Sequence, residues 1–276
     1  QISLRHTLKG HSKGINCLSV SLDGTLLLSG GDDAKLVVWN LGTGEDIQHI
    51  SCVVNGAVGA VAWITFGTVD SAFVFGCADG TLHVYRRQCD SQFQFCTTSI
   101  AHSGPVEGIA FDRTHRKVAT VGGGGPQVWN VSITGLLTPV VQTPPHQRFV
   151  PRGVEFCDNG ASIVVCYLES HDMYVICYAI EPWAVKWSSS IPTRIGHASI
   201  SGDGQHMVVS NLTSGVDVYS FPSLERIQQF SHVITCNVPL QVATAQKGAL
   251  VVSGGDAGFA RVYERSSGKL VASLTH

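Results

Sequence analysis

Histidine and cysteine are the residues of this chain best suited to metal binding or nucleophilic chemistry. The sequence holds twelve histidines and nine cysteines, but no His-x-x-x-His pair and no Cys-x-x-Cys pair. These are spacings by which a helix or a turn brings metal ligands together. A metal site would therefore need ligands from distant parts of the chain. We expect no metal and no other cofactor.

Two glycine-containing motifs resemble catalytic or phosphate-binding signatures. Residues 10–14 spell Gly-x-Ser-x-Gly, but a strand-like run follows them, where a nucleophile elbow requires a helix. Four consecutive glycines at 122–125 lack the Lys-Ser/Thr of a phosphate-binding loop. The carboxylates Asp32 and Asp33 are neighbours in a turn, so their side chains point apart. We expect no catalytic residue and no enzymatic activity.

Composition narrows the classes of partner. The chain has 276 residues, of which 44% are hydrophobic and 14% are charged, with 18 basic residues against 20 acidic ones. This balance and the lack of a basic tract argue against nucleic-acid binding. No apolar run is long enough to cross a bilayer, so we expect no membrane contact in this chain. A partner has to be recognised by local shape.

The segment from Gly10 to Asn40 predicts three antiparallel strands, because short apolar runs alternate with Asp/Gly-containing turns. A fourth run follows after the turn Gly42-Thr43-Gly44. The four expected strands are Ile15 to Val20, Thr25 to Ser29, Lys35 to Trp39, and Glu45 to Cys52.

The same order of events recurs along the chain. The segment that begins at Ala101 repeats the pattern of Gly10 onward, and His102 lies 91 positions after His11, about two units of 40 to 45 residues. Helical periodicity is absent, so the chain is predicted to be all-β. Six units are visible, at approximately 10–52, 55–100, 101–142, 149–191, 194–230 and 232–276.

The first unit resembles the WD-repeat family, whose repeat opens on Gly-His, carries an Asp-Gly turn and closes on Trp-Asp. Here these motifs are Gly10-His11, Asp23-Gly24 and Trp39-Asn40. The resemblance implies a single β-propeller domain over residues 1–276, made of four-stranded antiparallel blades. It also implies a buried hydrogen-bonded network, whose members here are His11, Ser29, Asp33 and Trp39.

Later units keep fragments of this pattern. His102, His197 and His232 stand where His11 does, and Trp129 or a tyrosine replaces Trp39. We therefore interpret these histidines as structural residues rather than ligands. The other fragments are Asp79 and Tyr85, Asp172 and Tyr178, Ser210 and Tyr219, and Ser253 and Tyr263.

The N-terminal segment raises the question of blade number. Ile2 to Leu8 reads as an outer strand, while the sixth unit already has its own outer strand at Lys269 to Leu274. We therefore predict most of a seven-bladed ring, whose seventh blade lacks its inner strands. The alternative is a six-bladed ring in which the N-terminal strand is an extra edge.

The favoured function is a non-catalytic scaffold that binds a protein or peptide on the loops at one end of the propeller, as part of a multiprotein complex. A rigid frame positions such loops, and arginine or aromatic anchors supply most of the energy of an interface. Arg148, Arg152 and Arg194 form a positive patch that would select an acidic peptide. The candidate partner-binding residues are Lys13, Asp32, His102, Arg148, Phe149, Arg152, Glu169, His171, Arg194 and Asp256.

The alternative function is a small-ligand or enzymatic site at the central channel. A perturbed carboxylate or a histidine cluster at the channel mouth would favour it. Cysteine usage bears on location: an odd number of cysteines, mostly in strand-like apolar runs, is typical of reduced thiols. We expect an intracellular protein, cytoplasmic or nuclear.

Overall fold

The computed structural model describes residues 4–66, 69–87, 92–140, 149–168, 174–256 and 258–275. Within these ranges every regular element is a β-strand, apart from the single-turn helices η1 (Asp158–Gly160) and η2 (Gln246–Gly248). The strands form six four-stranded antiparallel sheets. In each sheet, strands that follow one another in the sequence are hydrogen-bonded neighbours. The prediction of six four-stranded blades is therefore confirmed.

The strand bounds are as follows, sheet by sheet. The first three sheets contain β1 (Ile15–Val20), β2 (Leu26–Gly31), β3 (Lys35–Asn40) and β4 (Asp46–Ser51); β5 (Val58–Phe66), β6 (Val69–Cys77), β7 (Thr81–Arg87) and β8 (Phe93–Ile100); and β9 (Val106–Asp112), β10 (Lys117–Gly122), β11 (Gln127–Val131) and β12 (Leu137–Pro139). The last three sheets contain β13 (Val150–Cys157), β14 (Ser162–Leu168), β15 (Tyr174–Ala179) and β16 (Ala184–Ser190); β17 (His197–Ile200), β18 (His206–Ser210), β19 (Gly215–Ser220) and β20 (Arg226–Ser231); and β21 (Val242–Ala245), β22 (Leu250–Ser253), β23 (Phe259–Glu264) and β24 (Leu270–Thr275).

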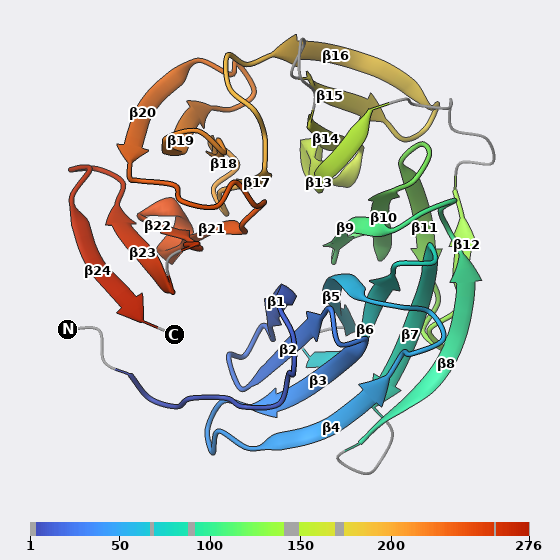
Figure 1. Ribbon diagram of the computed structural model, residues 1–276. Coiled ribbons are helices and arrows are strands. Elements are labelled where there is room, and N and C mark those ends of the chain that lie inside the picture. Colours follow the sequence, from blue (N-terminus) through green and yellow to red (C-terminus); the bar gives the residue numbers. More distant parts are fainter. Residues whose placement is uncertain are drawn as a thin grey trace. The chain divides into compact units, whose positions relative to one another are not determined.

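Two compact units divide the chain. The first comprises residues 1–148 with the short segments 158–163 and 179–184, and the second comprises 149–157, 164–178 and 185–276. Within the first unit, β5 packs against β1 and β9 packs against β5 (Figure 1). Within the second unit, β17 packs against β13 and β21 against β17. No helix in the described ranges is long and apolar enough to span a membrane.

Apolar side chains fill the space between consecutive sheets of each unit. In the first unit, one cluster lies between the first and second sheets around Leu28, Phe73 and Phe75. Another lies between the second and third sheets around Ile64 and Leu82. Corresponding clusters of the second unit lie between its sheets. Because both faces of a middle sheet are covered, its strands read as continuous apolar runs rather than alternating ones. β5 and β6 are examples.

The turn between the first two strands of a sheet follows from a Ser-x-Asp-Gly motif that occurs twice. Ser21 Oγ–H donates to Asp23 Oδ1 (2.6 Å), which also accepts from Thr25 N–H (3.0 Å), while Leu26 N–H donates to Ser21 Oγ (2.8 Å). Ser201 and Asp203 repeat these roles in the fifth sheet. Each motif ends on a glycine with φ near 70°, a conformation that disfavours other residues.

A β-bulge recurs between the third and fourth strands. In four sheets the register shifts just before the aromatic residue of the third strand, which is Trp39, Tyr85, Tyr219 or Tyr263. A bulge increases the local twist and redirects the side chains beside it. In each case the extra residue is on the fourth strand, at Ile47, Cys96, Ile227 or Val271, so the aromatic position of the third strand stands opposite a recurrent irregularity of the backbone.

The predicted N-terminal outer strand is not confirmed. Residues 4–14 belong to no strand, and Ile2 and Ser3 lie outside the described residues. His6 Nε2 lies 3.2 Å from the Gly42 carbonyl oxygen, so this segment follows the first sheet. A Cβ atom at Gly10 would lie 2.7 Å from the Trp39 ring, so only glycine fits there. The six sheets each contain four strands without this segment, so it is a strand of none of them.

Candidate interaction surface

The first sheet brings together the four residues that the repeat pattern selects. Trp39 Nε1–H donates to Ser29 Oγ (2.8 Å), and Ser29 Oγ lies 2.8 Å from His11 Nε2. His11 Nδ1 lies 2.9 Å from Asp33 Oδ1, and Ser12 N–H donates to Asp33 Oδ2 (3.0 Å). Although burial alone would raise the pKa of Asp33, the hydrogen bonds from His11 and Ser12 lower it.

The order Asp33, His11, Ser29 is that of a hydrolase triad, but its setting is structural. Ser29 is only 2% exposed, and its oxygen already accepts the indole N–H of Trp39. A nucleophilic serine needs a hydroxyl that a substrate can reach. The network instead satisfies polar groups that the sheet buries, which would otherwise destabilise the fold.

The third sheet repeats the network with two substitutions. His102 Nε2 lies 3.0 Å from Thr120 Oγ1, which accepts Trp129 Nε1–H (3.1 Å), so threonine replaces the serine. The glycine-rich turn that starts at Gly122 stands where the first sheet has Asp33. Burial lowers the pKa of His102 to about 4. The predicted contact of His102 with a partner stays a prediction: the residue is only 5% exposed, because the network holds it inside the sheet.

Tyrosines take the tryptophan position in the second unit, each with a different partner. Tyr178 Oη lies 3.1 Å from Tyr167 Oη, and Tyr219 Oη lies 3.2 Å from Thr193 Oγ1. Tyr263 Oη lies 3.3 Å from His232 Nδ1. A phenolic hydroxyl can both donate and accept a hydrogen bond, so a buried tyrosine finds a partner even where the other residues of the network are absent.

The loops at one end of the first unit are linked by hydrogen bonds from sheet to sheet. Backbone bonds join Cys52 to Ala34, Asp79 to Asn55, and His102 to Gly80. Asp32 Oδ1 accepts from Asn16 Nδ2 (2.8 Å), and Asp79 Oδ2 accepts from Asn55 Nδ2 (2.8 Å). These contacts hold the connections from an outer strand to the next inner strand as one rigid edge.

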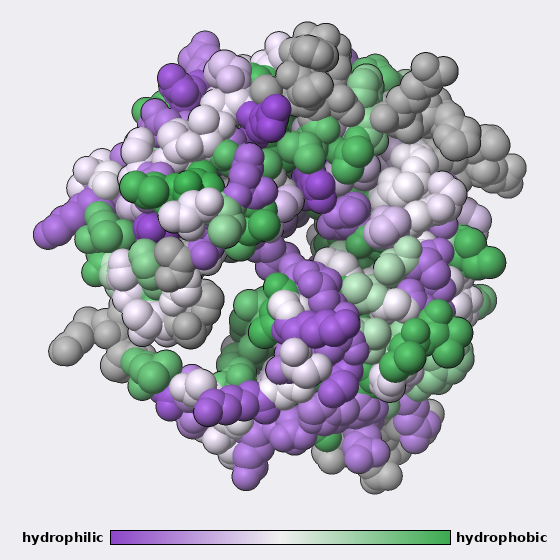
Figure 2. Space-filling model, viewed as in Figure 1, coloured by the Kyte–Doolittle hydropathy of each residue, from purple (hydrophilic) through white to green (hydrophobic). Residues whose placement is uncertain are grey.

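Exposed apolar and charged side chains share this edge. Val53 and Val54, between β4 and β5, are 75% and 94% exposed, and Ile100, at the end of β8, is 82% exposed. Lys13 and Asp32 are exposed on the loops of the first sheet. We call Lys13, Asp32, Val53, Val54 and Ile100 the rim. Figure 2 shows groups of hydrophobic side chains next to a continuous hydrophilic area on the face that carries the β4–β5 connection.

Comparison with known proteins identifies the repeat. Residues 2–40 match the family model for the WD domain, G-beta repeat. Over this segment the chain is similar to the WD-repeat proteins. Over 169 residues it is 25% identical to the mouse (Mus musculus) WD repeat- and FYVE domain-containing protein 4, covering 58% of this chain and 5% of that protein.

Two further relatives differ in name and in the share of the chain that they match. Over 211 residues it is 23% identical to the U3 small nucleolar RNA-associated protein 15 homolog of Xenopus tropicalis, covering 75% of this chain and 38% of that protein. Over 47 residues it is 48% identical to the small ribosomal subunit protein RACK1 of Medicago sativa, covering 17% of this chain and 14% of that protein. The chain thus spans a small part of the first two relatives.

The predicted partner-binding residues from Arg148 to Arg194 differ in exposure. Arg194 is exposed, Arg152 is partly buried in β13, and Arg148, Glu169 and His171 lie outside the described residues. Phe149 packs its ring edgewise on buried Tyr167, with ring centroids 5.8 Å apart. The role of Phe149 as a partner-binding anchor stays a prediction, and the partly buried ring also contributes to the packing of this sheet.

Asp256 is a capping residue of its loop. Its carboxylate accepts from Thr235 Oγ1–H (2.9 Å) and from the backbone N–H groups of Thr235 and Cys236. The Cys236 N–H and the Thr235 hydroxyl lower the pKa of Asp256. The side chain is partly exposed, so a partner would meet a carboxylate whose direction is already fixed.

Sequence reasoning missed Val53, Val54 and Ile100. A signal was present, because two valines directly before the Asn55-Gly56 turn place apolar side chains where a loop is normally polar. Their exposure was not predictable from pattern alone, because an apolar pair beside a strand reads as its continuation.

Proposed function

We propose that this WD-repeat chain is a non-catalytic scaffold whose rim binds a protein or peptide. The observation that supports the proposal is the exposure of Val53, Val54 and Ile100 on the same loop edge as Lys13 and Asp32, where backbone hydrogen bonds connect the loops. Exposed apolar groups surrounded by polar ones are typical of protein interaction sites. Rigid loops also reduce the entropy that binding costs.

The names of the relatives support this class of function. RACK1 is named as a ribosomal subunit protein, and other relatives include the human ribosome biogenesis protein BOP1, 42% identical over 55 residues, and yeast Elongator complex protein 2, 26% identical over 81 residues. Each of these two matches covers 10% or less of the relative. By analogy with these assemblies, we propose that the chain works within a multiprotein complex inside the cell, in the cytoplasm or the nucleus.

The rim can be tested with a charge-introducing double variant, Val53→Asp with Val54→Asp. The matched control is Ile133→Asp with Leu136→Asp, because these exposed residues lie between β11 and β12, at the opposite end of the same unit. Affinity capture from cells, followed by mass spectrometry, should recover the same partner with wild type and control. The rim variant should lose it.

Folding must be checked in parallel by circular dichroism and thermal melting, which should match wild type for both double variants. Equal capture by all three proteins would contradict the rim as the binding surface. Loss in the control alone would place the surface at the other end of the sheets.

A second candidate function rests on Glu155. This carboxylate lies on β13 in a small pocket lined also by Cys166, Ser199 and Met207, and burial raises its pKa to about 7. A carboxylate that titrates near neutrality is a candidate acid–base or ligand-binding group. A small-molecule library screened by thermal shift against wild type and Glu155→Gln tests this alternative, which predicts a stabilising ligand whose effect the variant loses.

Two finer features of the architecture belong to the same proposal. We propose that residues 1–276 act as one domain, which predicts a single calorimetric unfolding transition.

We also propose that Ile2–Leu8 is the outer strand of a seventh blade, since the six sheets have no vacant position. An experimental structure in which Leu4–Leu8 pairs with β24 would contradict the seventh blade.

A further inference from the structure

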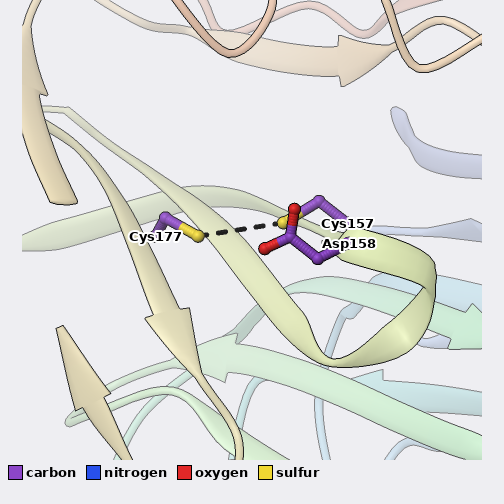
Figure 3. A group of neighbouring side chains, drawn as sticks. All are labelled: Cys157, Asp158 and Cys177. Carbon is purple, nitrogen blue, oxygen red and sulfur yellow. Dashed lines mark hydrogen bonds between the residues drawn. The ribbon is translucent and has the colours of Figure 1, made fainter. Parts of the chain in front are cut away.

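Two thiols that are 20 residues apart in the sequence meet in the fourth sheet. Cys157 is the last residue of β13, Cys177 lies in β15, and their sulfur atoms are 3.8 Å apart. Both side chains pack into the apolar cluster of the fourth and fifth sheets. Asp158 follows Cys157, and one of its carboxylate oxygens lies within 4.8 Å of both sulfurs (Figure 3).

The backbone after β13 explains how a carboxylate comes to lie beside Cys157. Consecutive residues of a strand point to opposite faces, so a continued strand would direct Asp158 away from the thiol. Instead the strand ends, and Asp158, Asn159 and Gly160 have φ values of 49°, 52° and 81°. Asp, Asn and Gly are the residues that accept this left-handed conformation best. The turn keeps Asp158 exposed and beside the two sulfurs.

The spacing of the two sulfurs fits a tetrahedral metal ion. Two thiolates that each bind zinc at about 2.3 Å, with a tetrahedral angle between them, lie roughly 3.8 Å apart. The exposed Asp158 carboxylate, which has an oxygen within 4.8 Å of both sulfurs, would supply an oxygen ligand. Within the described ranges, this is the one group of three His, Cys, Asp or Glu side chains with ligand atoms this close.

We propose that Cys157, Asp158 and Cys177 form a binding site for a thiophilic divalent cation, with Zn²⁺ as the expected ion. Two cysteines and one carboxylate give a soft, partly exposed site in which solvent supplies the fourth ligand. On binding, both thiols lose their protons to the buffer and two sulfur–metal bonds form, with no change in oxidation state. The site is independent of the proposed rim.

The test titrates the full chain, stripped with a chelator and kept reduced, with Co²⁺ as a spectroscopic probe. The protein carries Cys236→Ser, because Cys236 is an exposed thiol that would also bind the probe. We expect one Co²⁺ per chain, a thiolate-to-metal charge-transfer band, and displacement by Zn²⁺. Cys157→Ser and Cys177→Ser should each weaken binding at least tenfold, and Asp158→Asn should weaken it less.

The matched control is Cys77→Ser. Cys77 is as fully buried as Cys177 and belongs to the same apolar cluster as Cys52, so Cys52 and Cys77 are the thiol pair of the first unit that serves for comparison. This variant should bind Co²⁺ like its parent. A band that disappears in Cys77→Ser but persists in Cys177→Ser would overturn the proposal, as would the absence of any thiolate band at millimolar Co²⁺.

Cys177→Ser can fail to fold, because its side chain is buried, so a second readout uses the half-buried Cys157. Excess Zn²⁺ should raise the thermal midpoint of the parent, since a ligand that binds only the folded state stabilises it. The midpoint of Cys157→Ser should not move. A Zn²⁺-induced increase of the same size in that variant would contradict the site.

Discussion

Acid should destabilise this protein through His102, and the size of the effect can be calculated from its burial. The imidazole is enclosed beside Thr120, and burial lowers its pKa from 6.5 to about 4. Above pH 6.5 the side chain is neutral in both the folded and the unfolded state. Between these pKa values only the unfolded state binds the proton, so the free energy of unfolding falls as the pH falls. The loss approaches about 3 kcal/mol near pH 4.

The variant His102→Gln isolates this contribution. Glutamine keeps polar atoms near Thr120 but cannot titrate, so the variant should lose roughly 1 kcal/mol at pH 7 through an imperfect hydrogen bond. Near pH 4 wild type bears the protonation cost and the variant does not. The variant should therefore be the more stable protein by about 2 kcal/mol. His197 and Glu155 titrate identically in both proteins, so their contributions cancel in the difference.

Urea unfolding followed by tryptophan fluorescence, at pH 7 and near pH 4, measures both free energies of unfolding. Thr120→Val is the control, because it removes the hydroxyl that contacts His102 and Trp129 but retains the buried imidazole. It should destabilise the protein at both pH values. If the difference between wild type and His102→Gln were the same at the two pH values, His102 would not be held neutral by burial, and the reasoning would fail.

Three further predictions concern stability and thiol accessibility. Trp39→Ala should lower the free energy of unfolding by about 3 to 5 kcal/mol, because it empties a buried aromatic site and removes the donor to Ser29; chemical denaturation measures the change. Glu155→Gln should be up to about 3 kcal/mol more stable than wild type at pH 8 and equally stable at pH 4. The reason is that the Glu155 carboxyl has a pKa of about 7 in the folded protein, so it retains a proton that the unfolded chain releases near pH 4.5. Among the eight cysteines that the structure describes, a thiol reagent should modify native protein chiefly at exposed Cys236, because burial raises the pKa of both Cys17 and Cys166 to about 12. Denatured protein should react at all nine cysteines of the chain, and mass spectrometry counts the adducts.

The sequence predicts the sheets well because each is encoded locally. Ser21-Leu22-Asp23-Gly24 specifies its own turn, and the run from Lys35 to Trp39 can only be buried as a strand between two covered faces. The N-terminal segment was not predictable in the same way. Its apolar residues resemble a strand, but a strand requires a neighbouring strand to pair with. Whether a sheet has an edge strand available for pairing depends on how all the sheets are completed.

The candidate sites depended on information that the pattern lacks. His102 has the same letter and position as His11, yet whether such a residue is a surface or a core group depends on how Thr120 and Trp129 enclose it. Cys157 and Cys177 meet across β14, between strands that are not neighbours, and only the left-handed turn at Asp158 brings the carboxylate beside them. No spacing rule covers such a pair.

Every sheet of this chain pairs strands that follow one another in the sequence, and this order has a consequence for folding kinetics. All backbone pairing is between consecutive strands, so the loops that must close are short and the pairing part of the contact order is low for an all-β protein. Each sheet can form while later ones are still being synthesised, and it gains its apolar cover only when the next sheet arrives. Folding should therefore proceed from neighbour to neighbour. Destabilising substitutions in the first or the sixth sheet should therefore unfold that sheet before the sheets in the middle of the sequence.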